Sequence, residues 1–293
     1  RLGVTQRGTH AYCRLMSVIY AVLTSFSIGL SDFFASSITK RTSPNEVTSA
    51  TLLAGVVVTA VAAVFWSGDP TTSDLLYGAF AGAANGVGIL LYFVAFSRGS
   101  LRSTAPTAAV VMSGIPVLWD VLVLGASLST VTSIGLSIGV VAIALSSYGG
   151  GNPDSGPAGV VTAVLAGVVF GTLLILLSYI GDDAGGSPLL LQRVVAFLIA
   201  ISVTRATGPR IFPSKRTDFI VSFFGVGLFA IAAIILFVLA LREGNLAVAS
   251  VVGSQYAAVA VILGVVVRGQ RMRWWQGLGL SGSSLAVVLI VIG

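Results

Sequence analysis

The sequence has little charge and almost no metal-binding or redox-active residues. Of its 293 residues only 9% are Asp, Glu, Lys or Arg, too few for the polar surface of a water-soluble protein of this size. The single Cys13 excludes an intramolecular disulfide, and with the lone His10 it offers no zinc or iron cluster. The chain also lacks a P-loop, and no Ser-His-Asp set can form within its apolar part. We therefore predict no enzyme activity, no cofactor and no metal site.

Apolar residues dominate instead. They make up 56% of the chain, and the mean hydropathy is +1.00. Apolar runs of about twenty residues are typical of membrane-spanning helices, so the sequence predicts an all-α integral membrane protein whose partner is the lipid bilayer. The net charge of +6 would suggest nucleic acid in a soluble protein. Here the basic residues lie in short loops between apolar runs, as membrane topology requires, and we predict no nucleic-acid partner.

Short segments recur at a nearly constant distance along the chain. Residues 98–101 (RGSL) are echoed 145 residues later by 243–246 (EGNL), and 134–137 (IGLS) are echoed 144 residues later by 278–281 (LGLS). The triplet 21–23 (AVL) recurs 142 residues on. An offset of about half the chain length at three places indicates an internal duplication.

The duplication divides the chain. We predict a disordered N-terminal leader (1–15), a first five-helix repeat (16–148), a linker (149–157, GGGNPDSGP) and a second five-helix repeat (158–293). The expected spans are 16–38, 47–66, 75–96, 104–124, 131–147, 158–180, 188–203, 219–241, 246–267 and 274–292. Because five is odd, the second half must enter the membrane from the opposite side. The prediction is ten transmembrane helices arranged as two inverted repeats, as in many secondary transporters.

Glycines follow one face of the third predicted span. Gly78, Gly82 and Gly86 recur every four residues, and Gly135 and Gly139 do so in the fifth span. Small residues at this spacing allow helix backbones to approach closely in lipid. We expect each stripe to contact a neighbouring helix.

These features resemble the EamA family of the drug/metabolite transporter (DMT) superfamily. The resemblance lies in the two five-helix repeats, the glycine-rich first span, the turn between the third and fourth spans, and the small residues in the last span of each half. It covers the chain from Met16 onward. Two departures concern Gly125-Ala126 and Gly269-Gln270, where family members often have Gly-Glu, and Tyr256-Ala257, where a proline is common.

The resemblance implies a multi-pass transporter of the plasma (inner) membrane. It would export small metabolites, such as amino acids, or drugs by alternating access, through a cavity lined by the third, fourth, eighth and ninth spans. The alternative is a non-transporting scaffold or partner subunit. No motif in the chain specifies an oligomeric state.

Three charged residues lie well inside the predicted spans, where charge is costly. Asp32 belongs to the face Ser25-Gly29-Asp32-Ser36, and Asp120 to the face Pro106-Ala109-Ser113-Pro116-Asp120. Both faces are candidates for a wet, inward-facing surface. Asp32 is a candidate for proton coupling, with a solvated helix end as the alternative. We predict that Asp120 and Arg193 approach each other, as a gate, as an anchor for substrate charge or as a structural ion pair; Arg193 reaching toward the lipid headgroups is the alternative.

Uncharged polar residues complete the candidate substrate-binding or coupling set. They are Asn85, Tyr92, Gln192, Ser254, Gln255 and Tyr256, and hydrogen bonds between helices are the alternative explanation for each. Trp66, Trp274 and Trp275 lie at span ends and are expected to be interface anchors.

Two arguments on orientation disagree. The predicted loops opposite the N-terminus carry most of the Lys and Arg residues, and the positive-inside rule then places both termini outside the cell. The family resemblance implies that both termini are cytoplasmic.

Overall fold

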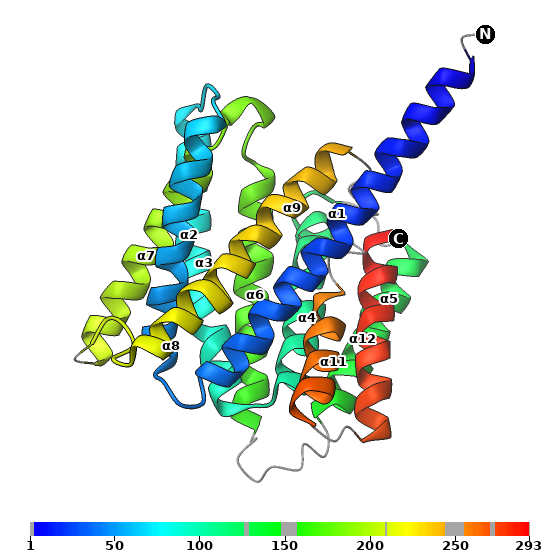
Figure 1. Ribbon diagram of the computed structural model, residues 1–293. Helices are drawn as coiled ribbons and strands as arrows, with labels where there is room; N and C mark the ends of the chain where they lie inside the picture. The colour runs from blue at the N-terminus through cyan, green and yellow to red at the C-terminus, as the bar shows by residue number, and fades with distance from the viewer. Residues whose placement is uncertain are drawn as a thin grey trace.

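The computed structural model describes residues 3–125, 129–147, 157–208, 210–243, 255–269 and 273–292, and in these the chain forms helices joined by short connections (Figure 1). The first half contains α1 (Gly3–Ile38), α2 (Pro44–Phe65), α3 (Thr72–Arg98), α4 (Leu101–Leu122) and α5 (Thr130–Ser147). The second half contains α6 (Pro157–Ser178), the short helix η1 (Asp182–Ala184), α7 (Ser187–Thr207), α8 (Arg216–Ile220), η2 (Val221–Leu228), α9 (Phe229–Glu243), α11 (Tyr256–Arg268) and α12 (Trp274–Ile292).

The predicted spans fall on these helices. Within the described residues, six helices are long and apolar enough to cross a membrane. Two shorter apolar helices, Thr130–Ala142 and Tyr256–Arg268, accompany them. The first part of the ninth predicted span, 246–254, lies outside the described residues. The all-helical class is therefore confirmed, and the full set of ten crossings stays a prediction.

Helix α1 is longer than the sequence suggested. It begins at Gly3 and runs to Ile38, so residues expected to form a disordered leader continue the first helix. Adding residues to an existing helix is much easier than starting one, and the stretch 4–15 contains no proline to end it. In Figure 1 this end of α1 projects beyond the rest of the bundle.

The glycine face of α3 packs against α7, as predicted. A Cβ atom on Gly78 would lie 2.6 Å from the carbonyl oxygen of Pro188. One on Gly82 would lie 2.5 Å from that of Gln192, and one on Gly86 would lie 2.9 Å from that of Ala196. The matching four-residue spacing on both helices means that two backbones touch over two turns, which only glycine allows.

The duplicated halves make equivalent contacts. Gly29 of α1 packs on Val259 of α11, and Gly171 of α6, 142 positions after Gly29, packs on Ile115 of α4, 144 positions before Val259. Added Cβ atoms would lie 2.6 Å and 2.4 Å from those valine and isoleucine side chains. The same crossing therefore occurs twice, once for each half, and both copies join one repeat to the other. This is the packing of an inverted repeat.

A π-helical segment, η2, interrupts the eighth span between α8 and α9. Wider π turns leave backbone carbonyls without their usual partners. Two of them accept side-chain hydrogen bonds from the first half: Ser31 Oγ donates to Val226 O at 3.0 Å, and Thr51 Oγ1 donates to Ser222 O at 3.3 Å. Hydroxyl groups of α1 and α2 thus bind η2 to the first repeat. The next helix, α9, packs against α1, and Figure 1 shows the two crossing the bundle together.

The connections α2–α3 and α6–α7 are tied together at one end of the bundle. Thr71 and Asp74 form a capping box at the start of α3. The other carboxylate oxygen of Asp74 accepts a 2.8 Å hydrogen bond from the backbone N–H of Gly181. Backbone bonds from Asp69 N to Asp183 O and from Gly186 N to Trp66 O complete the tie. These bonds bring Trp66 next to the start of α7.

Candidate functional site

Asp32 is buried between helices and holds a specific partner. The hydroxyl of Tyr92 on α3 donates a 2.7 Å hydrogen bond to Oδ2 of Asp32 on α1. The two residues are 5% and 6% exposed. The structure therefore joins two residues that the sequence nominated separately.

Aromatic side chains from both halves surround this pair. The Tyr92 ring lies 4.4 Å from that of Phe96 and 5.7 Å from that of Phe170, measured between ring centres. Tyr256 of α11 belongs to the same buried cluster and lies within electrostatic range of Asp32. A carboxyl group from the first repeat is thus enclosed by aromatic residues of both repeats.

The face of α1 that carries Asp32 was predicted to be wet, and in this structure it is packed. Ser25 and Ser36 are buried, and Gly29 lies directly against Val259. Beyond Ser36, Arg268 at the end of α11 donates a 3.1 Å hydrogen bond to Ser36 Oγ and further hydrogen bonds to Phe33 O and Ser37 Oγ. On this face Gly29 and Ser36 contact the second repeat, whereas Asp32 bonds Tyr92 of its own repeat.

The Asp120 face of α4 is described only in part. Ala109 is buried, and Ser113 donates to Ala109 O at 2.9 Å, so its hydroxyl is satisfied within its own helix. The side chain of Asp120 lies outside what the structure describes. The side chain of Arg193 extends toward α2 and α9. A Cβ atom added to Gly55 of α2 would lie 3.3 Å from its Cδ. The Asp120–Arg193 pair stays a prediction.

The uncharged candidates differ in their surroundings. Asn85 is 4% exposed, and its Nδ2 has no hydrogen-bond partner among the described residues. Gln192 is also buried, and its backbone carbonyl meets Gly82. Gln255 precedes α11 and is half-buried. Ser254 lies outside the described residues.

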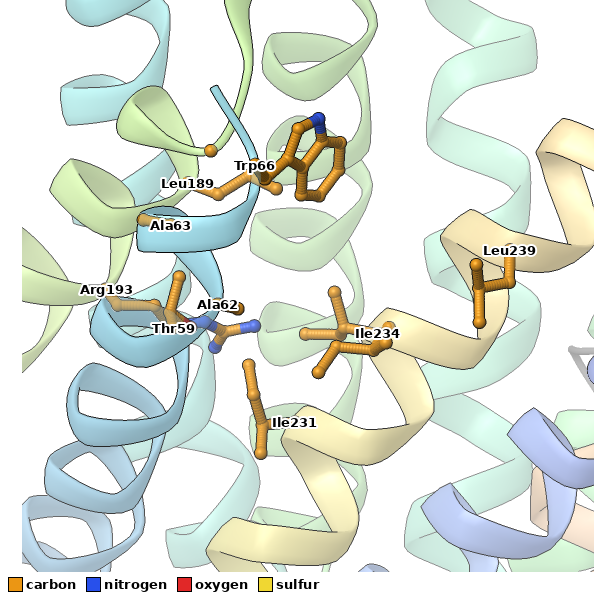
Figure 2. Close-up of a pocket in the computed structure, with 11 residues that line it drawn as sticks. Thr59, Ala62, Ala63, Trp66, Leu189, Arg193, Ile231, Ile234 and Leu239 are labelled. Atoms are coloured by element: carbon orange, nitrogen blue, oxygen red, sulfur yellow. The ribbon is translucent and has the colours of Figure 1, made fainter. Parts of the chain in front are cut away.

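Arg193 lines a cavity of about 150 Å³ between α2, α7 and α9. Figure 2 shows its guanidinium group pointing into this space, between Thr59 of α2 and Ile231 and Ile234 of α9, with the Trp66 ring nearby. The remaining lining residues are Ala62, Ala63, Gly186, Leu189, Ile235 and Leu239. Among the described lining residues, those from helices that the resemblance assigned to a cavity all belong to the eighth span.

Sequence reasoning found Arg193 but missed Thr59 and the cavity role of Trp66. The available signal was a single hydroxyl in the otherwise apolar run 56–65 (VVVTAVAAVF). Threonine is common in membrane helices, where it bonds its own backbone. Its significance therefore depends on what α7 and α9 bring beside it.

Comparisons with known proteins agree with this architecture. No curated protein matches the chain. The crystal structure of another protein superposes with a TM-score of 0.62 at 16% identity, over 93% of this chain and 98% of that one. At that identity the likeness establishes the fold alone.

Two segments of the chain, residues 15–148 and 157–292, match the EamA-like transporter family. The family agrees with the apolar helices and inverted repeat of the structure. The chain therefore belongs to the EamA-like transporter family and is a multi-pass membrane protein, and the family suggests a transporter of the DMT type.

Proposed function

We propose that this protein is a secondary transporter that exports small metabolites, such as amino acids, or drugs across the plasma membrane by alternating access. The observation that carries the proposal is the buried Asp32–Tyr92 pair within an aromatic cluster drawn from both repeats. A carboxyl group can bind and release a proton, and its ionised form is costly in a dry, low-dielectric interior. Any rearrangement that admits water to Asp32 then favours proton release.

Contacts between the repeats support the alternating-access part of the proposal. At one end of the bundle Arg268 of α11 binds the end of α1. At the other end, Asp74 binds the backbone of Gly181. Relative rocking of two repeats would break one set of contacts while keeping the other, which is how inverted-repeat transporters expose a central site to each side in turn.

A non-transporting scaffold is the second candidate, and one observation favours it. The cluster around Asp32 is closely packed, with Phe96 fully buried and Tyr92 6% exposed. A permanently dry centre would hold the fold together without a coupled cycle. Transport instead requires that this packing open during the cycle.

Flux measurements distinguish the two candidates. Purified protein in proteoliposomes is assayed for uptake and efflux of amino acids, organic acids and cationic drugs, with and without a pH gradient. Asp32→Asn is the test variant, because the amide oxygen can still accept the Tyr92 hydroxyl while the proton-binding group is gone. We expect wild-type flux to follow the gradient and the variant's flux to be independent of it. Equal gradient dependence in both would overturn the role of Asp32, and absence of flux for the whole panel would favour the scaffold.

A further inference from the structure

Arg193 is a buried cation without a visible counter-charge. Its side chain belongs to a residue that is 8% exposed, and within the described part of the chain no carboxylate, hydroxyl or carbonyl oxygen bonds it. An ionised group buried without a partner is strongly unfavourable. A bound anion would relieve this cost, and the guanidinium points into a cavity rather than into packed protein (Figure 2).

A second unsatisfied polar group lines the same cavity. The Oγ1 atom of Thr59 is buried and makes no hydrogen bond to any residue that the structure describes. Threonine in a helix usually donates to the carbonyl four residues earlier, as Thr48 and Thr204 do here. Thr59 and Arg193, from equivalent helices of the two repeats, therefore line one cavity, and the Thr59 hydroxyl beside it is left without a partner among the described residues.

Gly55 makes room for this arrangement. It lies one turn before Thr59 on α2, and a Cβ there would approach Cδ of Arg193 to 3.3 Å and Nε to 3.9 Å. The absence of a side chain at Gly55 lets the arginine stem lie along α2, so that its guanidinium reaches the cavity instead of the lipid. The position of the cation is thus determined by packing.

The rest of the wall is apolar. Trp66, Leu189 and the α9 residues Ile231, Ile234, Ile235 and Leu239 provide it, and none of the described residues that line the cavity is acidic. A ligand ammonium group would have no carboxylate to bind. The volume of about 150 Å³ equals that of an engineered apolar cavity known to accept benzene.

We propose that this cavity is a binding site for a small organic monocarboxylate with an apolar body about the size of one aromatic ring. The guanidinium of Arg193 donates to the carboxylate oxygens, since its fork matches carboxylate geometry. The Thr59 hydroxyl donates a further hydrogen bond, and the body packs against Trp66 and the isoleucines of α9. The claim that this ligand is a transported substrate rests on the proposed transport function and narrows its substrate class. The claim that the cavity binds the ligand does not depend on transport.

Benzoate is a suitable probe, and binding is measured by calorimetry on the full chain in nanodiscs of phosphatidylcholine, which carries no net charge. Benzyl alcohol and benzylamine have the same ring with a neutral or cationic group. We expect benzoate to bind and the other two compounds to bind at least about tenfold more weakly, because neither has a carboxylate to accept the charge-assisted hydrogen bonds of Arg193. Arg193→Gln should weaken benzoate about 10- to 100-fold and Thr59→Val about 3- to 10-fold. Arg205→Gln, an exposed arginine on the same helix, is the matched control and should bind as wild type.

The contrary results are equally definite. Failure of benzoate to bind wild type, or equal binding to Arg193→Gln and Arg205→Gln, would overturn the site. An anionic phospholipid shares the chemistry of a negative oxygen group on an apolar body. If phosphatidylglycerol in the nanodisc blocks benzoate in wild type, the assignment to a soluble carboxylate is overturned in favour of a lipid. Benzoate binding without benzoate flux would uphold the site and count against the transport function, so the two failures are distinguishable.

Discussion

The Tyr92 hydroxyl donates a 2.7 Å hydrogen bond to the Asp32 carboxylate where aromatic residues of both repeats converge. Replacing Tyr92 with Phe leaves a buried carboxylate without this donor. We expect Tyr92→Phe to lower the free energy of unfolding in detergent by about 1–3 kcal/mol and to reduce substrate flux in proteoliposomes. Tyr77→Phe is the control, because Tyr77 lies on the same helix and its hydroxyl has no hydrogen bond to any described residue. Equal effects of the two changes would show that the Asp32 bond contributes nothing specific.

The glycine crossings between the repeats predict a pair of equal destabilisations. Gly29→Ala and Gly171→Ala each place a Cβ within 2.6 Å of a β-branched side chain, Val259 or Ile115. Overpacking of this kind costs about 1–3 kcal/mol, and the two values should be similar because the contacts are equivalent. Gly114→Ala is the matched helical control, since its nearest neighbour is the flexible end of Leu136 at 3.3 Å. Unfolding in detergent measures all three, and an innocuous Gly171→Ala would contradict the observed crossing.

The contacts of Arg268 are expected to hold α11 of the second repeat against α1 of the first. Its guanidinium binds Ser36, Ser37 and the carbonyl of Phe33, and its Cζ atom lies 4.0 Å from the centre of the Phe33 ring. Arg268→Gln should destabilise the folded state by about 1.5–3 kcal/mol, because several charge-assisted bonds disappear. It should also increase the labelling of a cysteine introduced at Ser37, in a Cys13→Ser background. Unchanged labelling would mean that this end is held closed by other contacts.

The ion pair between Arg41 and Asp218 should contribute unequally from its two sides. Arg41 Nη2 lies 3.0 Å from Asp218 Oδ1, and the side chains are 59% and 9% exposed. Arg41→Gln should cost less than about 1 kcal/mol, and less at high salt. Asp218→Ala also removes the acceptor of the Thr42 hydroxyl, 2.9 Å away, and should cost about 1.5 kcal/mol or more. Denaturation at low and high salt tests the difference; equal costs would assign the whole effect to the exposed pair.

The stability of Arg193 variants distinguishes two hypotheses for Arg193, a ligand site and the predicted pair with Asp120. If Arg193 has no counter-charge until an anion binds, Arg193→Met should stabilise the ligand-free protein by about 1 kcal/mol or more, because an uncompensated buried charge is removed. If Arg193 pairs with Asp120, then Arg193→Met and Asp120→Asn should both destabilise it, and the double variant should be more stable than the sum of the single losses implies. The signs of the two changes in unfolding free energy decide between the alternatives.

Several features followed directly from the residues. Apolar runs long enough to span a bilayer predicted helices, because a chain in lipid must satisfy its own backbone hydrogen bonds. The recurrence of 98–101 at 243–246 predicted a duplication, and the Gly29 and Gly171 crossings confirm it in three dimensions. The glycine stripe of α3 predicted close helix contact, and its partner proved to be α7. All three depend on periodicity or repetition, which a single sequence displays.

Other features depended on side chains that lie far apart in sequence. Asp32 could be nominated as a costly buried charge, but its partner Tyr92, 60 positions away, is determined by how α1 meets α3. The wet face predicted around Asp32 is packed in this structure, because the partner surface on α11 fills it. The sequence signal of Thr59, one hydroxyl in an apolar run, was not specific, since a hydroxyl in an apolar helix usually bonds its own backbone.

The sequence by itself thus determined the membrane class, the two inverted repeats and the glycine faces along which helices touch, because hydropathy and small-residue spacing act along one helix at a time. Only the tertiary structure decided that Asp32 meets Tyr92, that Arg268 fastens α11 to α1, and that Arg193 and Thr59 share one cavity. Those relationships arise where helices that are distant in the sequence cross, within the first half for Asp32 and Tyr92 and between the halves for the other two. The distance between two such side chains is set by backbone packing at the glycines, not by their separation along the chain.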